Sequence, residues 1–277
     1  FKSVQSTLNS IKETLYAEII FSEVAMAFEI ETLNVAPAIK VKGNGEHVVG
    51  ILMSDLNQNP DNTKLLSLSE INYLVDKTYK PTTENNLSSA LKTLKEYKGH
   101  LLSNGASEVY FDKNIINYLK QMIFMDYLTH NVDGHDQNVA FLVQRDENNV
   151  VHIKAAKMFD NESSFLFNQF AFSIKNGKPI NLAGMAQFDN FFSLVIPLTI
   201  KMHIINKFMR LLKKMNFFKL FIKRQRRLIL MKFWKEYQNA MKALEIPKKY
   251  LEAAKQLLQF KIDKLTLCLK CEKELEF

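Results

Sequence analysis

Four polar side chains of the kinds that carry out enzyme chemistry lie close together in this 277-residue chain, directly after an apolar run. A carboxylate or an imidazole can accept or donate a proton, and carboxylate and amide oxygens bind hard cations such as Mg²⁺. The stretch DYLTHNVDGHDQN (126–138) is therefore a candidate for a catalytic loop or a metal site, with an ordinary polar loop as the alternative. Its four candidate residues are Asp133, His135, Asp136 and Asn138.

The elements around this stretch determine which side chains can meet. Apolar residues recur at helical spacing over 112–129, so a helix is predicted to run straight into the polar stretch. After it, VAFLV, the turn QRDENN and VVHIKAA predict a β-hairpin over 139–156. Because a hairpin returns its second strand to the start of its first, Asp160 in MFDN is expected to lie beside Asn138.

This arrangement divides the work between three residues. Mg²⁺ usually takes one or two carboxylates from the protein and keeps positions for substrate phosphates. Asn138 and Asp160 would supply an amide and a carboxylate oxygen, and Asp133 would remain free to accept the proton of an attacking hydroxyl. Protein kinases have this division of labour, with an Asn five positions after the catalytic Asp. The pattern therefore favours phosphoryl transfer from ATP.

The motif VDGHDQN, followed by a hairpin and FDNESS, resembles the catalytic loop and metal segment of the HipA-like serine/threonine kinases. These atypical bacterial protein kinases include toxin and effector kinases. The resemblance implies an α+β, two-lobed protein kinase-like fold with ATP between the lobes. It makes Asp133 the catalytic base, Asn138 and Asp160 the ligands of Mg²⁺ (or Mn²⁺), and His135 a residue that orders the loop. Asp136 is expected only to be solvated.

The resemblance extends over residues 1–170 in the order of the elements. A kinase needs a strand Lys on the α/β-phosphates and a helix Glu to hold it. The resemblance assigns these roles to Lys2 and Glu23, with Glu18 as the rival of Glu23. Met53 and Asp55, in ILMSD, fall where a kinase hinge holds ATP, with Asp55 as a candidate contact to the ribose.

The N-terminal elements are predicted from local signals. Residues 10–33 read as one helix with a capping box at Ser10 and Glu13, and two β-rich runs around Asn44-Gly45 predict a hairpin. The polar segment SDLNQNPDNTK then suggests a boundary between an N-lobe (1–55) and a C-lobe (56–277) with further helices. No Gly-rich phosphate loop is visible and the chain starts at Phe1 without Met, so we expect a truncated N-lobe.

A basic stretch at 207–235, within a helical pattern, contains no acidic residue in a chain whose net charge is +8. Two interpretations stay open: a core helix with a solvated cationic face, or a site for an inositol polyphosphate or an anionic lipid. Aromatic side chains fall on the apolar face, so nucleic acid is not expected as a direct substrate. The residues that share the basic face are Lys219, Lys223, Arg226 and Arg227.

The remaining composition restricts location rather than activity. No apolar run approaches the ~20 residues of a membrane span, and no signal peptide is visible. The only cysteines, Cys268 and Cys271, read as reduced thiols on a helix. We expect a cytoplasmic protein, or an effector delivered into a host cell, at most peripheral to membranes.

The sequence thus predicts an ATP- and Mg²⁺-dependent kinase for Ser or Thr of a still unidentified protein substrate. Two alternatives remain. One is a lipid or inositol phosphate kinase of the same fold, and the other is a catalytically degenerate kinase fold that binds partners through the basic helix.

Overall fold

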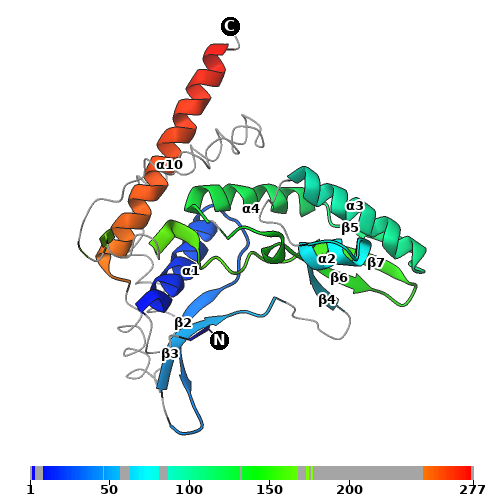
Figure 1. Cartoon of the computed structure of the whole chain (residues 1–277), viewed down its shortest axis with the longest axis horizontal. Helices are drawn as coiled ribbons and strands as arrows, with labels where there is room; N and C mark the ends of the chain where they lie inside the picture. The colour runs from blue at the N-terminus through cyan, green and yellow to red at the C-terminus, as the bar shows by residue number, and fades with distance from the viewer. Residues whose placement is uncertain are drawn as a thin grey trace.

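A short antiparallel sheet and one long helix, α1 (Asn9–Ala27), form the N-terminal part of the molecule (Figure 1). The computed structural model describes residues 2–3, 9–45, 47–56, 63–80, 87–131, 133–167, 173–174, 176 and 246–275. The strand order is β1-β3-β2, with both pairs antiparallel. The strands are β1 (Lys2–Ser3), β2 (Val35–Val41) and β3 (His47–Met53).

The hairpin predicted around Asn44-Gly45 is confirmed. β2 and β3 pair from Val35 opposite Met53 to Val41 opposite His47. Gly45 closes the turn with φ of +80° and donates its N–H to the carbonyl of Lys42 at 2.9 Å. A residue with a side chain would be strained in that conformation, so glycine fits this position.

The helix α1 packs on the sheet through Leu15 and Ile19, which form a small apolar cluster with Ile51 of β3. It ends at Ala27 instead of near residue 33, because Glu29 adopts a left-handed φ of 59° and Ile30 donates its N–H back to the carbonyl of Ala25. The extension to residue 33 is therefore wrong.

The expected capping box at Ser10 and Glu13 is also wrong, because α1 begins at Asn9 and Ser10 therefore lies inside the helix; the Glu13 carboxylate is buried and accepts a hydrogen bond from Tyr250. The structure has a capping box elsewhere, at Ser67 and Glu70. The Ser67 hydroxyl accepts from the Glu70 N–H at 3.1 Å, and the Glu70 carboxylate accepts from the Ser67 N–H at 2.7 Å.

A second sheet, in the order β4-β6-β7-β5, lies beside three helices at the other end of the molecule (Figure 1). The hairpin predicted over 139–156 is confirmed as β6 and β7, which pair antiparallel. β5 joins β7 in parallel, and the sequence patterns gave no sign of β4 or β5. The elements are β4 (Thr63–Ser67), α2 (Leu68–Val75), α3 (Leu87–Ser103), β5 (Glu108–Phe111), α4 (Ile115–Thr129), β6 (Ala140–Arg145) and β7 (Val150–Ala155).

One continuous apolar core connects α1 with α4 and with the C-terminal helix α10 (Lys248–Leu275). Phe28 and Phe124 meet edge to face with ring centroids 5.3 Å apart. α10 adds Tyr250, Ala254 and Leu257 to the same core. The chain is therefore an α+β protein in which the C-terminal helix packs against the first helix.

Some expectations fall outside the described residues. These are the basic stretch at 207–235, with Lys219, Lys223, Arg226 and Arg227, and the side chains of Cys268 and Cys271. The boundary between residues 55 and 56 stays a prediction. Among the residues that the structure describes, no helix is long and apolar enough to cross a membrane.

Replacing Ser67 by Ala should lower the free energy of unfolding by about 1 kcal/mol, because α2 loses one half of its capping box. Urea denaturation measures this. Ser88→Ala, at an exposed position inside α3, is the matched control and should have little effect. Equal losses in the two variants would contradict the role given to the cap.

Candidate active site

The polar loop that follows α4 starts with a sharp change of direction. His130 caps the helix in the left-handed conformation, with φ of 50°, and its N–H bonds to carbonyls of the last turn. The loop runs on to the short 3₁₀ helix η1 (Asp136–Asn138), directly before β6. α4 and β6 are both held in the core, so the loop is anchored at both ends.

Asp126, on the last turns of α4, organises the first half of this loop. The Asn131 side-chain amide donates to Asp126 Oδ1 at 3.0 Å, and Asn131 Oδ1 accepts from the N–H of Asp133 at 3.2 Å. Gly134 lies against the same carboxylate, because a Cβ built there would meet Asp126 Oδ2 at 2.6 Å. A glycine in the motif DGH is thus needed for space.

The chemical state of Asp126 reflects this enclosure. Burial raises the pKa of Asp126 to about 7, against the opposing effect of the Asn131 hydrogen bond and with a smaller contribution from the charge of Asp133. The sequence reasoning gave Asp126 no role. The available signal was a carboxylate within the apolar run of a helix.

Asp133, His135 and Asn138 are connected through the loop backbone. The side-chain amide of Asn138 donates to the carbonyl of Asp133 at 2.9 Å, and the N–H of His135 donates to the same carbonyl at 2.8 Å. The nitrogen of the Asn138 amide is therefore committed to the loop, and the oxygen is directed away from that carbonyl. The Asp133 carboxylate is 41% exposed, so a substrate can reach it.

His135 lies beside Asp133, the candidate base. Its Nε2 is 3.4 Å from Asp133 Oδ1, and its carbonyl accepts the N–H of Asn138 at 3.0 Å. These contacts link His135 to both ends of the Asp133–Asn138 segment. Its role in ordering the loop remains a prediction.

Asp136 differs from the expectation that it is only solvated, and that expectation is wrong. It is 2% exposed, and its Oδ2 accepts a hydrogen bond from the hydroxyl of Tyr79. Tyr79 follows α2 and is 57 positions away along the chain. The 3₁₀ turn of η1 directs this carboxylate inward, which the residue spacing could not reveal.

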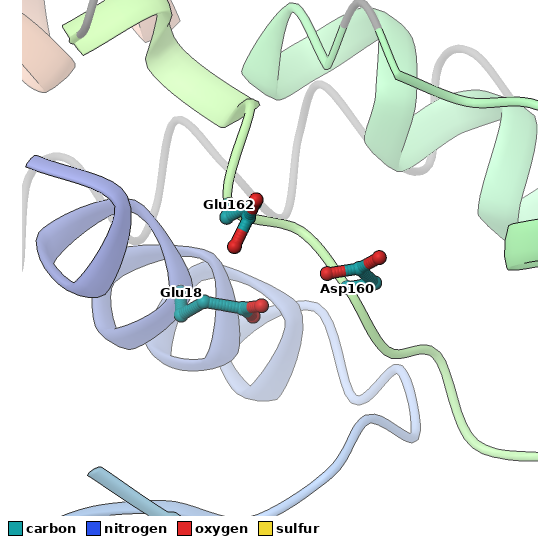
Figure 2. Close-up of side chains that lie close together, drawn as sticks. All are labelled: Glu18, Asp160 and Glu162. Carbon is teal, nitrogen blue, oxygen red and sulfur yellow. The ribbon is translucent and has the colours of Figure 1, made fainter. Parts of the chain in front are cut away.

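The segment that follows β7 brings Asp160 to helix α1. Asp160 has a left-handed φ of 56°, and its carboxylate groups with those of Glu18 and Glu162, with one oxygen from each within 4.8 Å of the others. Figure 2 shows Glu18 extending from α1 toward the two acids on the opposite segment. Glu18 is 2% exposed, and its Oε1 accepts the N–H of Asn161 at 3.0 Å.

Glu18, and not Glu23, is the helix carboxylate at this segment. The two residues are five positions apart on α1, which turns Glu23 by about 140° around the helix axis. Glu23 is half-buried and does not belong to the carboxylate group. The structure therefore places Glu18, the rival of Glu23, at the Asp160 segment.

The other expected contacts to ATP lie on the N-terminal sheet. The backbone of Lys2 pairs opposite Ile51, whose side chain packs on α1 between Leu15 and Ile19. The Lys2 side chain itself lies outside the described part. Met53 ends β3 half-buried, and Asp55 is exposed just beyond it.

Backbone contacts hold the Asp160 segment between the two parts of the molecule. Met158 accepts hydrogen bonds from the Leu33 N–H at 3.1 Å and the Thr32 hydroxyl at 3.0 Å, just after α1. On the other side, Ala156 donates its N–H to the carbonyl of Ala140 in β6. The position of Asp160 relative to α1 is therefore fixed from both directions.

The return of the hairpin brings Asn138 close to the Asp160 segment. Asn138 lines a cavity of about 10 Å³ together with Phe159 and Asn161, the two neighbours of Asp160. Asp126 and His135 line the same cavity, which has room for one water molecule. The loop and the segment thus converge, as the hairpin argument anticipated.

Replacing Gly134 by Ala should lower the free energy of unfolding by about 1–3 kcal/mol, because the new methyl group must displace the Asp126 carboxylate. Thermal or urea unfolding measures the change. Gly99→Ala, in an open position on α3, is the control and should be neutral or stabilising. A Gly134→Ala protein as stable as wild type would refute the close contact.

Replacing Asp126 by Asn should remove a pH dependence of stability. The folded pKa of about 7 exceeds the ordinary 3.8, so this group's contribution to stability is complete below pH 3.8 and is lost as the pH rises through 7. The free energy of unfolding of Asp126→Asn, relative to that of wild type, should therefore rise by roughly 2–4 kcal/mol between pH 4 and pH 8. Urea unfolding at both pH values tests this, with the exposed Asp263→Asn as control.

An unchanged stability difference between wild type and Asp126→Asn at the two pH values would contradict the enclosed state of this carboxylate.

The chain is similar in structure to a proinflammatory kinase of Helicobacter pylori, CtkA, with a TM-score of 0.53 and 13% sequence identity. The similarity covers 96% of this chain and 89% of that one. No protein-family model matches the chain, and no curated protein matches it. At this identity the likeness carries the fold alone: the chain has an α+β, kinase-like fold.

Proposed function

We propose that this protein is a kinase that uses ATP and a divalent cation to phosphorylate Ser or Thr of a protein substrate. The observation that carries the proposal is the meeting of Glu18 on α1 with Asp160 on the segment after the hairpin, beside the loop of Asp133 and Asn138. Kinases require a helix Glu and a metal-binding Asp to be in place together. The kinase-like fold supplies the context.

The donor set suits Mg²⁺ or Mn²⁺. Asn138 commits its amide nitrogen to the Asp133 carbonyl and leaves the oxygen for a ligand, and Asp160 adds a carboxylate. One carboxylate oxygen from each of Glu18, Asp160 and Glu162 lies within 4.8 Å of the other two. The mutual repulsion of these carboxylates favours a cation at this place. A bound Mg²⁺ would neutralise the phosphate charge that develops during transfer.

Asp133 would act on the acceptor. Its partly exposed carboxylate accepts the hydroxyl proton of the substrate Ser or Thr while that oxygen attacks the γ-phosphorus. The bond between the γ-phosphorus and the oxygen bridging to the β-phosphate breaks, and ADP leaves. His135, 3.4 Å from Asp133, helps to hold this carboxylate in the loop.

The N-lobe would hold the nucleotide. Glu18 would orient the ammonium group of Lys2 toward the α/β-phosphates, with Met53 and Asp55 at the adenine and ribose side. The pairing of β1 with β3, and of β3 with α1 through Ile51, supports this arrangement because it joins the Lys2 strand to the Glu18 helix.

The alternatives depend on residues outside the described part. A lipid or inositol phosphate kinase, or a binding protein that uses Lys219, Lys223, Arg226 and Arg227, would rely on the basic stretch at 207–235. Comparing phosphate transfer to casein, phosphoinositide vesicles and inositol hexakisphosphate separates these possibilities. The resemblance to HipA-like kinases adds the proposal of a toxin or effector role, with delivery into a host cell in the second case.

Asp133→Asn and Asp160→Asn should each reduce phosphate transfer from ATP to a general acceptor such as casein by about 100-fold or more, because one loses the proton acceptor and the other a metal ligand. Transfer of radiolabelled phosphate measures this. Asp112→Asn, in the half-buried turn before α4, is the matched control. Full activity of Asp160→Asn would overturn the proposed function.

Glu18→Gln should weaken phosphate transfer by about tenfold or more, whereas Glu23→Gln should have a much smaller effect, because Glu18 bonds to Asn161 and its carboxylate groups with that of Asp160. Both variants make the same change on the same helix, so each controls for the other. The reverse order of losses would restore Glu23 as the functional residue.

A further inference from the structure

The C-terminal helix α10 reaches the candidate active site indirectly, through the first helix. Its N-terminal turns lie against α1 and the short 3₁₀ helix η2 (Ser164–Leu166), as Figure 1 shows. Tyr250 is the side chain at this junction, and it is 2% exposed. Because Tyr250 is far from both segments in sequence, the contact joins three separate parts of the chain.

A buried hydrogen bond connects α10 to α1. The Tyr250 hydroxyl donates to Glu13 Oε1 at 2.6 Å, and Glu13 is also 2% exposed. Burial and the Glu13 carboxylate raise the pKa of Tyr250 well above its ordinary value, so the hydroxyl keeps its proton and remains the donor. Removing one partner of a buried hydrogen bond is costly, because the other partner is left without one.

Aromatic contacts place the same ring against the Asp160 segment. The Tyr250 ring lies 5.3 Å from the ring of Tyr16 on α1 and 5.3 Å, edge to face, from that of Phe167. Phe167 follows Asp160 by seven positions and directly succeeds η2. Tyr250 therefore touches both partners of the Glu18–Asp160 contact: the helix that carries Glu18 and the segment that carries Asp160.

Helix geometry relates the bond at Glu13 to the position of Glu18. The two residues are five positions apart, so they lie about 7.5 Å apart along the axis of α1. A helix bonded through one side chain resists rotation about its axis and sliding along it. A rotation or shift of α1 at Glu13 would also move Glu18, since the helix between them is continuous.

A second contact fixes α10 to the helix of the catalytic loop. Lys261 Nζ lies 4.5 Å from the centre of the Tyr127 ring on α4, and Lys261 is buried. The Tyr127 hydroxyl donates to the Lys261 carbonyl at 3.5 Å. α10 thus holds α1 through Tyr250 and α4 through Lys261, and it bridges the two elements that bring the site together.

We propose that Tyr250 is a positioning residue of the kinase site: its hydrogen bond to Glu13 fixes the rotation and height of α1 and thereby holds Glu18 against the Asp160 segment. The inference rests on the proposed function, because it acts through the role of Glu18 there. The C-terminal helix is, in this account, a built-in support for the nucleotide site.

The test measures the affinity of the full chain for Mg²⁺-ATP by calorimetry. Tyr250→Phe keeps the ring and its contacts with Tyr16 and Phe167 but removes the hydroxyl. We expect the Kd for Mg²⁺-ATP to rise by about tenfold, the equivalent of one lost buried hydrogen bond. Tyr97→Phe, a buried tyrosine on α3 away from α1, is the matched control and should leave the Kd within about twofold.

The partner residue provides an independent variant. Glu13→Gln keeps an acceptor oxygen for Tyr250 and should stay close to wild type, whereas Glu13→Met removes the acceptor and should reproduce the loss seen with Tyr250→Phe. If Tyr250→Phe does not fold, the comparison of Glu13→Gln with Glu13→Met decides the question. Equal Kd values in these two Glu13 variants would overturn the proposal.

A double variant separates positioning from a general structural role. If Tyr250 acts through Glu18, then Glu18→Gln combined with Tyr250→Phe should bind Mg²⁺-ATP no more weakly than Glu18→Gln alone. Additive losses would overturn the proposal while leaving the proposed function intact, and so would a wild-type Kd for Tyr250→Phe beside a weakened Glu18→Gln. A wild-type Kd for Glu18→Gln would remove the role of Glu18 and the proposal with it.

Discussion

The contact between Glu18 and the Asp160 segment is the constraint on which the arrangement of this molecule depends. A buried carboxylate on the first helix accepts the N–H of Asn161 at 3.0 Å, across 143 positions of sequence. Charge in a buried place is costly unless it is hydrogen-bonded or near a cation. The hydrogen bond offsets that cost where α1 meets the segment after β7, the place where the proposed kinase site needs negative charge to hold Mg²⁺ and a lysine.

The surrounding elements act to keep this contact in place. Thr32 and Leu33 bond to Met158 just beyond α1, and α10 bonds to α1 itself through Tyr250 and Glu13. In the loop before β6, the Asp126 carboxylate accepts a hydrogen bond from Asn131. Position 134 lies so close to this carboxylate that only glycine fits there. Each of these contacts links segments far apart in sequence, so the candidate site is a product of tertiary structure.

The local features could be predicted from the sequence because they depend on neighbouring residues. Two β-rich runs around Asn44-Gly45 predicted the first hairpin, and the runs on either side of QRDENN predicted the second. Helical spacing of apolar residues predicted α4. The proximity of Asn138 to the Asp160 segment followed from the second hairpin alone. The resemblance of VDGHDQN and FDNESS to segments of the HipA-like kinases also implied a kinase-like fold.

The features that the sequence did not predict depend on which face a helix turns to its neighbours or on contacts with residues far away in sequence. Nothing in the spacing on α1 could show that Glu18 bonds to the Asp160 segment, because its partner Asn161 is far away in sequence. Asp136 was expected to be solvated and Glu13 to form a capping box, but each accepts a hydrogen bond from a distant tyrosine, Tyr79 for Asp136 and Tyr250 for Glu13. Strand β5 pairs in parallel with β7, and such pairing has no local turn signal.

The central claim is that Asp160 and Asn138 hold a divalent cation together with a nucleotide. Mn²⁺ can replace Mg²⁺ in such sites and can be followed directly by electron paramagnetic resonance in the presence of a non-hydrolysable ATP analogue. The account predicts tight, nucleotide-dependent Mn²⁺ binding in the wild-type chain and its loss in Asp160→Asn. Mn²⁺ binding that is unchanged in Asp160→Asn, or that is absent from the wild-type chain with the analogue bound, would contradict it.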